Sequence, residues 1–221
     1  MKKNAEKMKQ SRPPQHEPLL QHDLDFLKQG YSSLAGVDEA GRGPLAGPVV
    51  ASAVIVRDFS FSCTVNDSKK MSAKARERAF EEILSKCVVG IGIVDCRMID
   101  KIDIFQATLR AMEEAVMKLG EAPGVILVDG PKTPNLPFRQ VPIVDGDAIS
   151  FSIACASVVA KVTRDRMMEY YAEEFPQYGF AKHKGYGTRD HVEAIKIHGP
   201  CKIHRRSFEP VKSLYGNTAY N

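Results

Sequence analysis

Two adjacent carboxylates, Asp38 and Glu39, stand between two apolar segments and constrain this chain more than any other feature. The segment that starts at Leu34 ends at this pair, and the run from Val49 to Val56 is typical of a buried strand. A charged group beside a hydrophobic core costs free energy unless it is paired or bound to a cation. Asp38 and Glu39 are therefore candidate ligands of a divalent metal ion.

A turn rich in glycine and proline, Gly41-Arg42-Gly43-Pro44, connects the two predicted strands and suits a hairpin. Glycine allows close approach of a ligand, so amides of this turn could bond a ribose hydroxyl or a phosphate. A hairpin that merely needs glycines is the alternative. The pattern Gly41-x-Gly43-x-x-Ala46 also fits dinucleotide binding, but that motif requires a helix next, and a strand follows here. A nicotinamide cofactor is therefore the least favoured interpretation.

The remaining periodicity predicts an α/β fold, with a mixed sheet covered by helices. Antiparallel strands come first, and strands then alternate with helices. Strands are expected at 34–38, 49–56, 88–94, 124–128 and 140–144, and helices at 72–86, 104–119, 148–175 and 188–198. Residues 1–30 are polar and indicate a disordered arm followed by a short helix.

Composition limits the class of protein. The chain has 221 residues, of which 43% are hydrophobic, and this suffices for one globular domain with appendages. No apolar run approaches the roughly 20 residues that cross a bilayer, and the polar N-terminus lacks the apolar segment of a secretory signal. The five cysteines are scattered, with no C-x-x-C pair, which indicates a reducing compartment. We expect a cytoplasmic protein that does not associate with membranes.

Two further acids follow or precede predicted elements where a site could form. Asp129 ends the strand at 124–128, and Asp147 precedes the long predicted helix. Sheets collect their sites at the carboxyl ends of strands, so Asp38 and Asp129 lie together if their strands run parallel. Carboxylates without paired histidines suit magnesium or manganese, and two such ions could activate a water and stabilise the leaving oxygen of a phosphodiester. Taken alone, Asp129 could end an ordinary turn and Asp147 could cap a helix.

Basic residues gather toward the C-terminus. The net charge is −3 over residues 31–179 and +5 over residues 180–212. This asymmetry suits a metal centre flanked by a surface that binds a polyanion, although a solvated face decorated with lysines explains it as well. Lys161 and Arg164, on the long predicted helix, are candidates for contacts with such a substrate.

The segment around Tyr186 combines an aromatic ring with basic residues. Tyr186 stands between two glycines and could stack on a base or sugar while Lys182 and Lys184 hold phosphates. A surface loop with a tyrosine anchor is the alternative. Further along, His198, Cys201 and His204 are spaced three residues apart, but no fourth ligand is evident, and we discount a zinc site.

Taken together, several segments resemble bacterial ribonuclease HII. The most specific are Gly-Val-Asp-Glu-Ala-Gly-Arg-Gly-Pro-Leu-Ala-Gly-Pro at 36–48 and Tyr-Gly-Phe-Ala-Lys-His-Lys-Gly-Tyr-Gly-Thr at 178–188. All of them occur in the order of the family and cover about residues 33–211; the others are 67–70, 128–130, 152–166 and 204–208. The resemblance implies a ribonuclease H-like fold. We divide the chain into the arm at 1–30, a catalytic domain at 31–187, and a basic, helical, substrate-binding segment at 188–221 packed on that domain.

The resemblance also implies roles for single residues. The positions of the four metal-binding, catalytic carboxylates are occupied by Asp38, Glu39, Asp129 and Asp147. Gly41-Arg42-Gly43, assisted by Tyr186, matches the segment that senses the 2′-hydroxyl at an RNA–DNA junction.

Three other positions bear on the match. Lys69 lies in the segment at 67–70 and is a further expected substrate contact. Asp165 matches an acid of the family that supports the metal ligands without binding the metal itself. Pro131 stands where the family usually has asparagine, so any amide contact there is lost. The arm lies outside the resemblance.

From these observations we expect a Mn²⁺- or Mg²⁺-dependent endoribonuclease. It would cut the RNA strand of RNA–DNA hybrids and the 5′ side of ribonucleotides embedded in duplex DNA, leaving 5′-phosphate and 3′-hydroxyl ends, and would act as a monomer. One alternative is a nucleic-acid-binding module without catalysis, whose sign would be a missing carboxylate; none of the four is missing. Another is ribonuclease HIII, for whose folded N-terminal domain residues 1–30 are too short.

Overall fold

The computed structural model describes residues 17–215, so most of the expected disordered arm lies outside the described residues. Five strands form one sheet in the order β3-β2-β1-β4-β5. The first three are antiparallel neighbours, whereas β4 runs parallel to β1 and β5 parallel to β4. The mixed sheet expected from the sequence is confirmed. The strands are β1 (Leu34–Ala40), β2 (Val49–Val56), β3 (Cys87–Val94), β4 (Val125–Asp129) and β5 (Gln140–Ile143).

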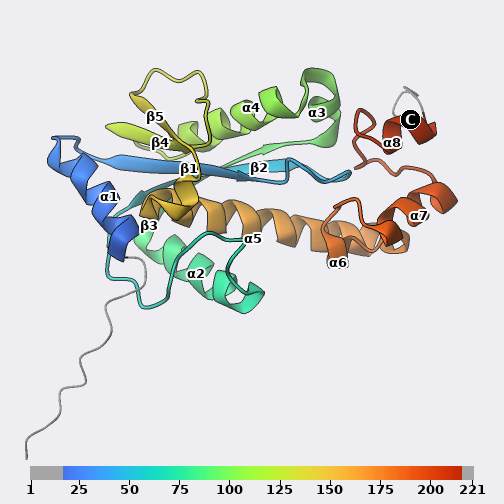
Figure 1. The fold of residues 1–221 in the computed structure, drawn as a ribbon, viewed down its shortest axis with the longest axis horizontal. Helices are drawn as coiled ribbons and strands as arrows, with labels where there is room; N and C mark the ends of the chain where they lie inside the picture. The colour runs from blue at the N-terminus through green and yellow to red at the C-terminus, as the bar shows by residue number, and fades with distance from the viewer. Residues whose placement is uncertain (1–16, 216–221) are drawn as a thin grey trace, which may run out of the picture.

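Helices cover both faces of this sheet (Figure 1). Helices α3 and α4 lie on one face, and α1, α2 and the long α5 lie on the other. Helices α6, α7 and α8 gather at the C-terminal end of α5. The helices are α1 (Glu17–Lys28), α2 (Ala73–Lys86), α3 (Cys96–Ile102), α4 (Ile104–Met117), α5 (Phe151–Glu174), α6 (Phe180–His183), α7 (Arg189–His198) and α8 (Val211–Tyr215), with single 3-10 turns at Gly146–Ala148 and Pro176–Tyr178.

Side-chain caps fix where the main helices begin. The hydroxyl of Ser72 accepts a hydrogen bond from the Ala75 amide, and that of Thr188 accepts one from His191. Both helices start where the sequence predicts. The long helix does not begin at 148 as predicted, because Ser150 caps it and residues 146–148 form a separate 3-10 turn.

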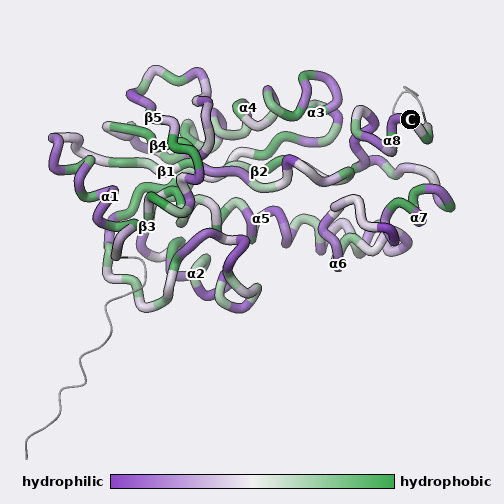
Figure 2. The backbone as a smooth tube through the Cα atoms, viewed as in Figure 1, coloured by the Kyte–Doolittle hydropathy of each residue, from purple (hydrophilic) through white to green (hydrophobic). Residues whose placement is uncertain are grey.

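Close packing of α5 on the sheet depends on Gly36 in β1. A Cβ at this position would lie 2.1 Å from the backbone carbon of Ser152, so only glycine lets the helix approach. The apolar side of α5 and the inner side of β2 then form one core, and α4 forms a second core on the opposite face. In Figure 2 the hydrophobic stretches run along the central strands, and hydrophilic stretches mark many of the outer loops.

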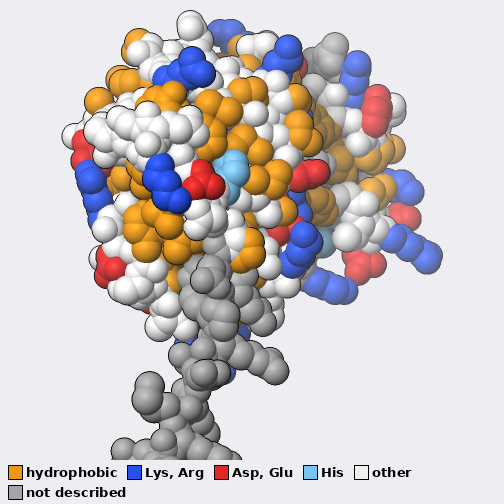
Figure 3. Space-filling model, turned by 60° about the vertical axis from the view of Figure 1, so that its left-hand side comes forward, with side chains coloured by type: hydrophobic (Ala, Val, Ile, Leu, Met, Phe, Trp, Pro, Cys, Tyr) orange, Lys and Arg blue, Asp and Glu red, His pale blue; other side chains and the backbone are white. Residues whose placement is uncertain are grey.

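The N-terminal helix is tied to this framework. The short helix expected after the arm is present as α1, and its Asp23 is 1% exposed. The Asp23 carboxylate accepts a hydrogen bond of 2.7 Å from the Ser152 amide, at the positive end of α5. On the face around this helix, acidic and basic side chains are interspersed with apolar ones (Figure 3).

The C-terminal segment packs on the end of α5. One apolar cluster joins Leu45, Met168 and Phe180 to Ile195 and Val211. The cluster therefore crosses the boundary expected at 187, and the division into two units stays a prediction.

None of the helices described between residues 17 and 215 is both long and apolar enough to span a bilayer. All five cysteines carry free thiols.

Candidate active site

Three carboxylates converge where β1 and β4 end. The parallel register pairs Val37 with Val128, so the next residues, Asp38 and Asp129, stand side by side at the carboxyl edge. Asp38, Glu39 and Asp129 each offer an oxygen, and these oxygens all lie within 4.8 Å of one another. The strands therefore bring together the acids at the two separate strand ends that the sequence singles out.

Backbone amides and a hydroxyl orient two of these carboxylates. Asp38 accepts a hydrogen bond of 2.6 Å from the amide of Glu39 and a further one from the hydroxyl of Ser157 on α5. Asp129 accepts one of 2.7 Å from the amide of Gly146. The direction of each carboxylate is set by backbone that the sheet and the 3-10 turn hold in place.

Asp147 lies beside this group of three. Burial, followed by the charges of Asp67 and Asp129, raises the pKa of Asp147 to about 6. Asp67 also shares a hydrogen bond with Asp147 and is itself 8% exposed. Burial acts to raise the pKa of Asp67, but bonds from the Lys69 amide and the Lys70 ammonium lower it overall. Sequence reasoning did not single out Asp67 as a fifth acid; only its place in the segment at 67–70 signals it.

The electrostatics of the group fit a divalent cation. Burial, and then the charges of Glu39 and Asp129, raise the pKa of Asp38 well above its usual range. Burial likewise raises the pKa of Glu39, although Arg42 partly offsets this rise. Crowded, buried carboxylate oxygens are hard ligands that suit magnesium or manganese, and a bound cation would remove their mutual repulsion. The residues present therefore fit the metal that the sequence implies.

A cleft of about 510 Å³ opens next to Glu39. It is lined by the glycine turn, by Lys69 and Lys161, and by Tyr186. The turn and the tyrosine face each other, because a Cβ at Gly43 would lie 3.7 Å from Cε1 of Tyr186. The structure thus brings the expected ribose-sensing segment, the tyrosine and two of the expected basic residues to the carboxylates.

The other expected substrate contacts differ in their surroundings. Arg164 also lines this cleft, but it is 1% exposed, and its guanidinium donates to the carbonyl oxygens of Ala46, Pro48 and Lys184. The basic character of an arginine in a sequence does not reveal that its guanidinium is buried among carbonyls. Lys182 is exposed and pairs with Asp190.

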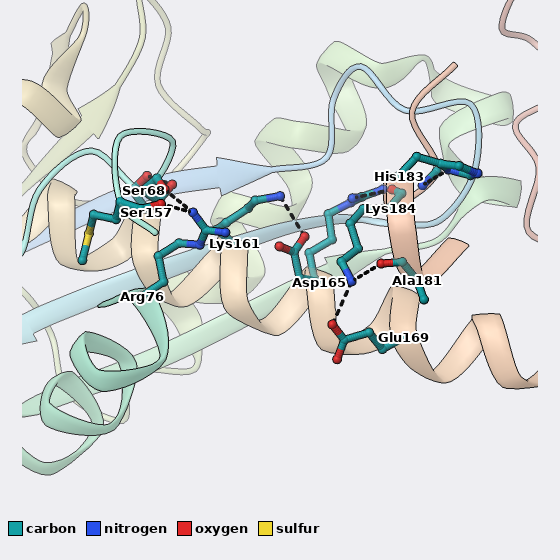
Figure 4. Close-up of polar contacts among 12 residues, drawn as sticks. Ser68, Arg76, Ser157, Lys161, Asp165, Glu169, Ala181, His183 and Lys184 are labelled. Atoms are coloured by element: carbon teal, nitrogen blue, oxygen red, sulfur yellow. Dashed lines mark hydrogen bonds and ion pairs between the residues drawn. The ribbon is translucent and has the colours of Figure 1, made fainter. Parts of the chain in front are cut away.

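The contacts along α5 are shown in Figure 4. The ammonium of Lys184 bonds Glu169 at 2.7 Å. Asp165 pairs with Lys161 at 2.8 Å, and its expected support of the metal ligands stays a prediction. Ser157 bonds the hydroxyl of Ser68, and this contact ties α5 to the 67–70 segment.

Two of the three residues discounted as zinc ligands, Cys201 and His204, take part in a series of hydrogen bonds that also includes His191. His204 is fully buried, its Nδ1 accepts from the Cys201 amide at 2.9 Å, and its Nε2 lies 3.0 Å from Nε2 of His191. His191 Nδ1 in turn lies 2.9 Å from the Tyr186 carbonyl oxygen. The ring nitrogens of His191 and His204 therefore all have hydrogen-bond partners.

Hard oxygen ligands at adjacent parallel strand ends, opening on a cleft with basic and aromatic side chains, define a metal-dependent phosphodiesterase. Comparison with known proteins makes this class specific. The family model described as Ribonuclease HII matches residues 35–211. Ribonuclease HII of Syntrophus aciditrophicus is 54% identical over 192 residues, or 86% of this chain and 90% of that protein. Ribonuclease HII of Geotalea daltonii is 53% identical over 200 residues, or 90% and 93%.

Solved structures give the same answer for the fold. Ribonuclease H2 from Pyrococcus horikoshii superposes with a TM-score of 0.71 and 25% identity, covering 82% of this chain and 96% of that one. Bst-RNase HIII in complex with Mn²⁺ superposes with a TM-score of 0.64 and 18% identity over 82% and 68%, and that likeness concerns the fold alone. The chain belongs to the ribonuclease HII family. It is a metal-dependent endoribonuclease with ribonuclease H activity on RNA–DNA hybrids.

Proposed function

We propose that this enzyme also cuts duplex DNA on the 5′ side of single embedded ribonucleotides, leaving 5′-phosphate and 3′-hydroxyl ends. The observation that carries this proposal is the shared cleft: Gly43 and Tyr186 face each other next to Glu39, within reach of one nucleotide. A ribose differs from a deoxyribose only by its 2′-hydroxyl, which a backbone amide and an aromatic ring can recognise together. Recognition of a single ribose does not require neighbouring ribonucleotides in the same strand.

Asp38, Glu39 and Asp129 would hold Mn²⁺ or Mg²⁺, and Asp147 would complete the ligand set from the other side of Asp129. Bound there, the cations supply Lewis acidity for attack by water on the phosphodiester and for departure of the leaving oxygen. The Glu39 and Gly146 amides hold the carboxylates in direction, so little reorganisation is needed when the substrate arrives.

Lys69 and Lys161 would hold phosphates on either side of the scissile bond. Lys69 lines the cleft beside the acids. Burial acts to lower the pKa of Lys69, but the charges of Asp38 and Asp147 help to raise it overall. Lys161 lines the same cleft from α5.

Cleavage mapping tests the proposal. The substrate is an end-labelled DNA duplex with one ribonucleotide, compared with the same duplex made only of DNA, in Mn²⁺ and then in Mg²⁺. We expect one product, cut 5′ to the ribonucleotide, and no cleavage of the all-DNA duplex. Asp38→Asn should remove the activity, whereas Glu81→Gln, a charge change on the outer side of α2, should not. Equal cutting by the wild type and Asp38→Asn would overturn the proposal, as would a cut at any other position.

A further inference from the structure

Two arginines with no carboxylate partner are buried behind the glycine turn. Arg164 on α5 and Arg205 in the segment after α7 are 1% and 0% exposed. Within residues 17–215, every hydrogen bond that the structure gives their guanidiniums goes to a backbone carbonyl oxygen. A buried cation is costly, and two neighbouring ones repel each other. Two buried arginines of this kind are retained only where the surrounding structure holds them in place.

Two of the three carbonyls that Arg205 holds belong to the turn itself, and the third, that of Gly47, follows it. Its guanidinium donates to the oxygens of Gly41 at 2.5 Å, Arg42 at 2.8 Å and Gly47 at 2.8 and 3.0 Å. In a trans peptide the carbonyl and the next amide point in opposite directions. Because the Gly41 and Arg42 carbonyls point inward to Arg205, the amides of Arg42 and Gly43 point outward. Both of these residues are exposed and line the cleft.

Arg164 holds the other side of the same cleft. It donates to the carbonyls of Ala46 and Pro48, which follow the turn, and to that of Lys184, two residues before Tyr186. A backbone bond of 2.8 Å from the Leu45 amide to the Gly185 carbonyl runs parallel to this link. One guanidinium and one amide therefore link the segment after the turn to the tyrosine loop by hydrogen bonds.

We propose that Arg205 and Arg164 are positioning residues for recognition of the ribose: they fix the outward amides of the turn and the place of Tyr186, without touching the substrate. This inference rests on the proposed function, because it assumes that the cleft reads a 2′-hydroxyl. Lysine cannot reproduce the planar fork that spans several carbonyls, although it keeps the charge. Arg205→Lys and Arg164→Lys should therefore loosen the turn with the buried charge retained.

The experiment measures discrimination, which a simple loss of stability does not change. In an Asp38→Asn background, binding is compared between a duplex with one ribonucleotide and the matched all-DNA duplex. A protein that is partly unfolded binds both duplexes less in equal proportion, whereas a displaced turn weakens only the preference for ribose. We expect each lysine variant to lower the ratio of the two affinities about fivefold, the effect of losing one well-placed hydrogen bond, with the all-DNA affinity unchanged.

Arg166→Lys is the matched control, because Arg166 lies two residues along α5 with its side chain 47% exposed and pairs with Glu77 on the surface. It should keep the parent ratio. The inference is overturned if Arg205→Lys or Arg164→Lys is folded by circular dichroism and keeps the parent ratio; if one of them does not fold, the other decides. A parent protein without any preference for ribose would instead overturn the proposed function, and the inference with it.

Discussion

Gly43 and Gly41 are two residues apart, yet the structure assigns them different physical roles. A Cβ at Gly43 would meet Tyr186 at 3.7 Å, an ordinary van der Waals contact. A Cβ at Gly41 would lie 2.0 Å from Nε of Arg164, and Gly41 has φ of +98°, which strains any residue with a side chain. Gly41 therefore serves packing of the turn, and Gly43 leaves room in the cleft.

This contrast predicts opposite outcomes for two alanine variants. Gly43→Ala should fold with the wild-type melting temperature but lose about tenfold in kcat/KM on a single-ribonucleotide duplex, because the methyl group fills the gap that a sugar would enter. Gly41→Ala should lower the melting temperature. Thermal melting and steady-state kinetics of both variants check this. Wild-type kcat/KM for Gly43→Ala would show that the gap is not used.

Sequence reasoning at the residue scale succeeds where chemistry depends on strand ends and fails where it depends on packing. The proximity of Asp38 and Asp129 could be predicted from the sequence, since each residue stands at the end of an apolar strand segment. Arg164 could not be placed, because two of its three carbonyl partners, Ala46 and Pro48, lie more than 100 residues away along the chain. Asp67 carries no local sign of its neighbour Asp147 for the same reason.

At the scale of elements, two buried histidines connect α7 and the segment after it to the Tyr186 loop. The Cys201 amide donates to Nδ1 of His204, so His204 carries its proton on Nε2 and donates to His191. His191 must then donate from Nδ1 to the Tyr186 carbonyl. These hydrogen bonds can form together only when both imidazole rings are neutral. Burial favours that state, because it lowers the pKa of His191 to about 4 and that of His204 to about 3.

The two hydrogen-bonded histidines predict that the free energy of unfolding decreases as the pH falls below about 6.5, the pKa of a histidine in the unfolded state. Between pH 6.5 and about pH 4, the histidines bind protons in the unfolded state but stay neutral in the folded state. The free energy of unfolding therefore decreases as the pH falls. Each histidine contributes a slope of about 1.4 kcal/mol per pH unit in this window. Urea unfolding at several pH values should therefore show a shallower slope for His191→Gln than for the wild type.

The acids of the metal site titrate in the opposite sense, so the comparison must be made between variants and not on the wild type alone. His198→Gln is the control, since His198 lies on the exposed side of the same helix. It should keep the wild-type slope. If His191→Gln keeps it as well, His191 is not the group that takes up the proton.

Element boundaries follow from the sequence when one polar residue decides them. Ser72 and Thr188 cap their helices as expected. Helix α3 was missed because it is short and its neighbour α4 begins just after it, separated by Asp103 at φ of +65°. A positive φ at a residue other than glycine is set by tertiary packing, and local preference does not predict it.

For the whole molecule, the sequence yields the strands and the kind of sheet, but not the register that builds the site. The pairing of Val37 with Val128 depends on how α4 and α5 pack on opposite faces, which no local pattern encodes. One residue of slip would turn Asp129 to the other face of the sheet. The cores on both faces therefore determine the geometry of the carboxylates, although neither core contributes a ligand.

The crowding of these acids affects the stability of the whole fold. Asp38 is buried against the charges of Glu39 and Asp129, so the metal-free protein carries repulsion that a cation would relieve. At pH 8, Mn²⁺ at 100 times its Kd should raise the melting temperature by about 5–10 °C. Asp38→Asn should raise the melting temperature of the metal-free protein, because it removes one of the repelling charges, and should reduce the gain from Mn²⁺.

Thermal melts with and without Mn²⁺ for the wild type, Asp38→Asn and Glu81→Gln measure both effects. Glu81→Gln removes a charge of the same sign from the surface and should behave as the wild type does. If Asp38→Asn melts below the wild type without metal, the repulsion does not govern stability. If it gains as much from Mn²⁺ as the wild type, the cation that stabilises the fold binds somewhere other than the converging ends of β1 and β4.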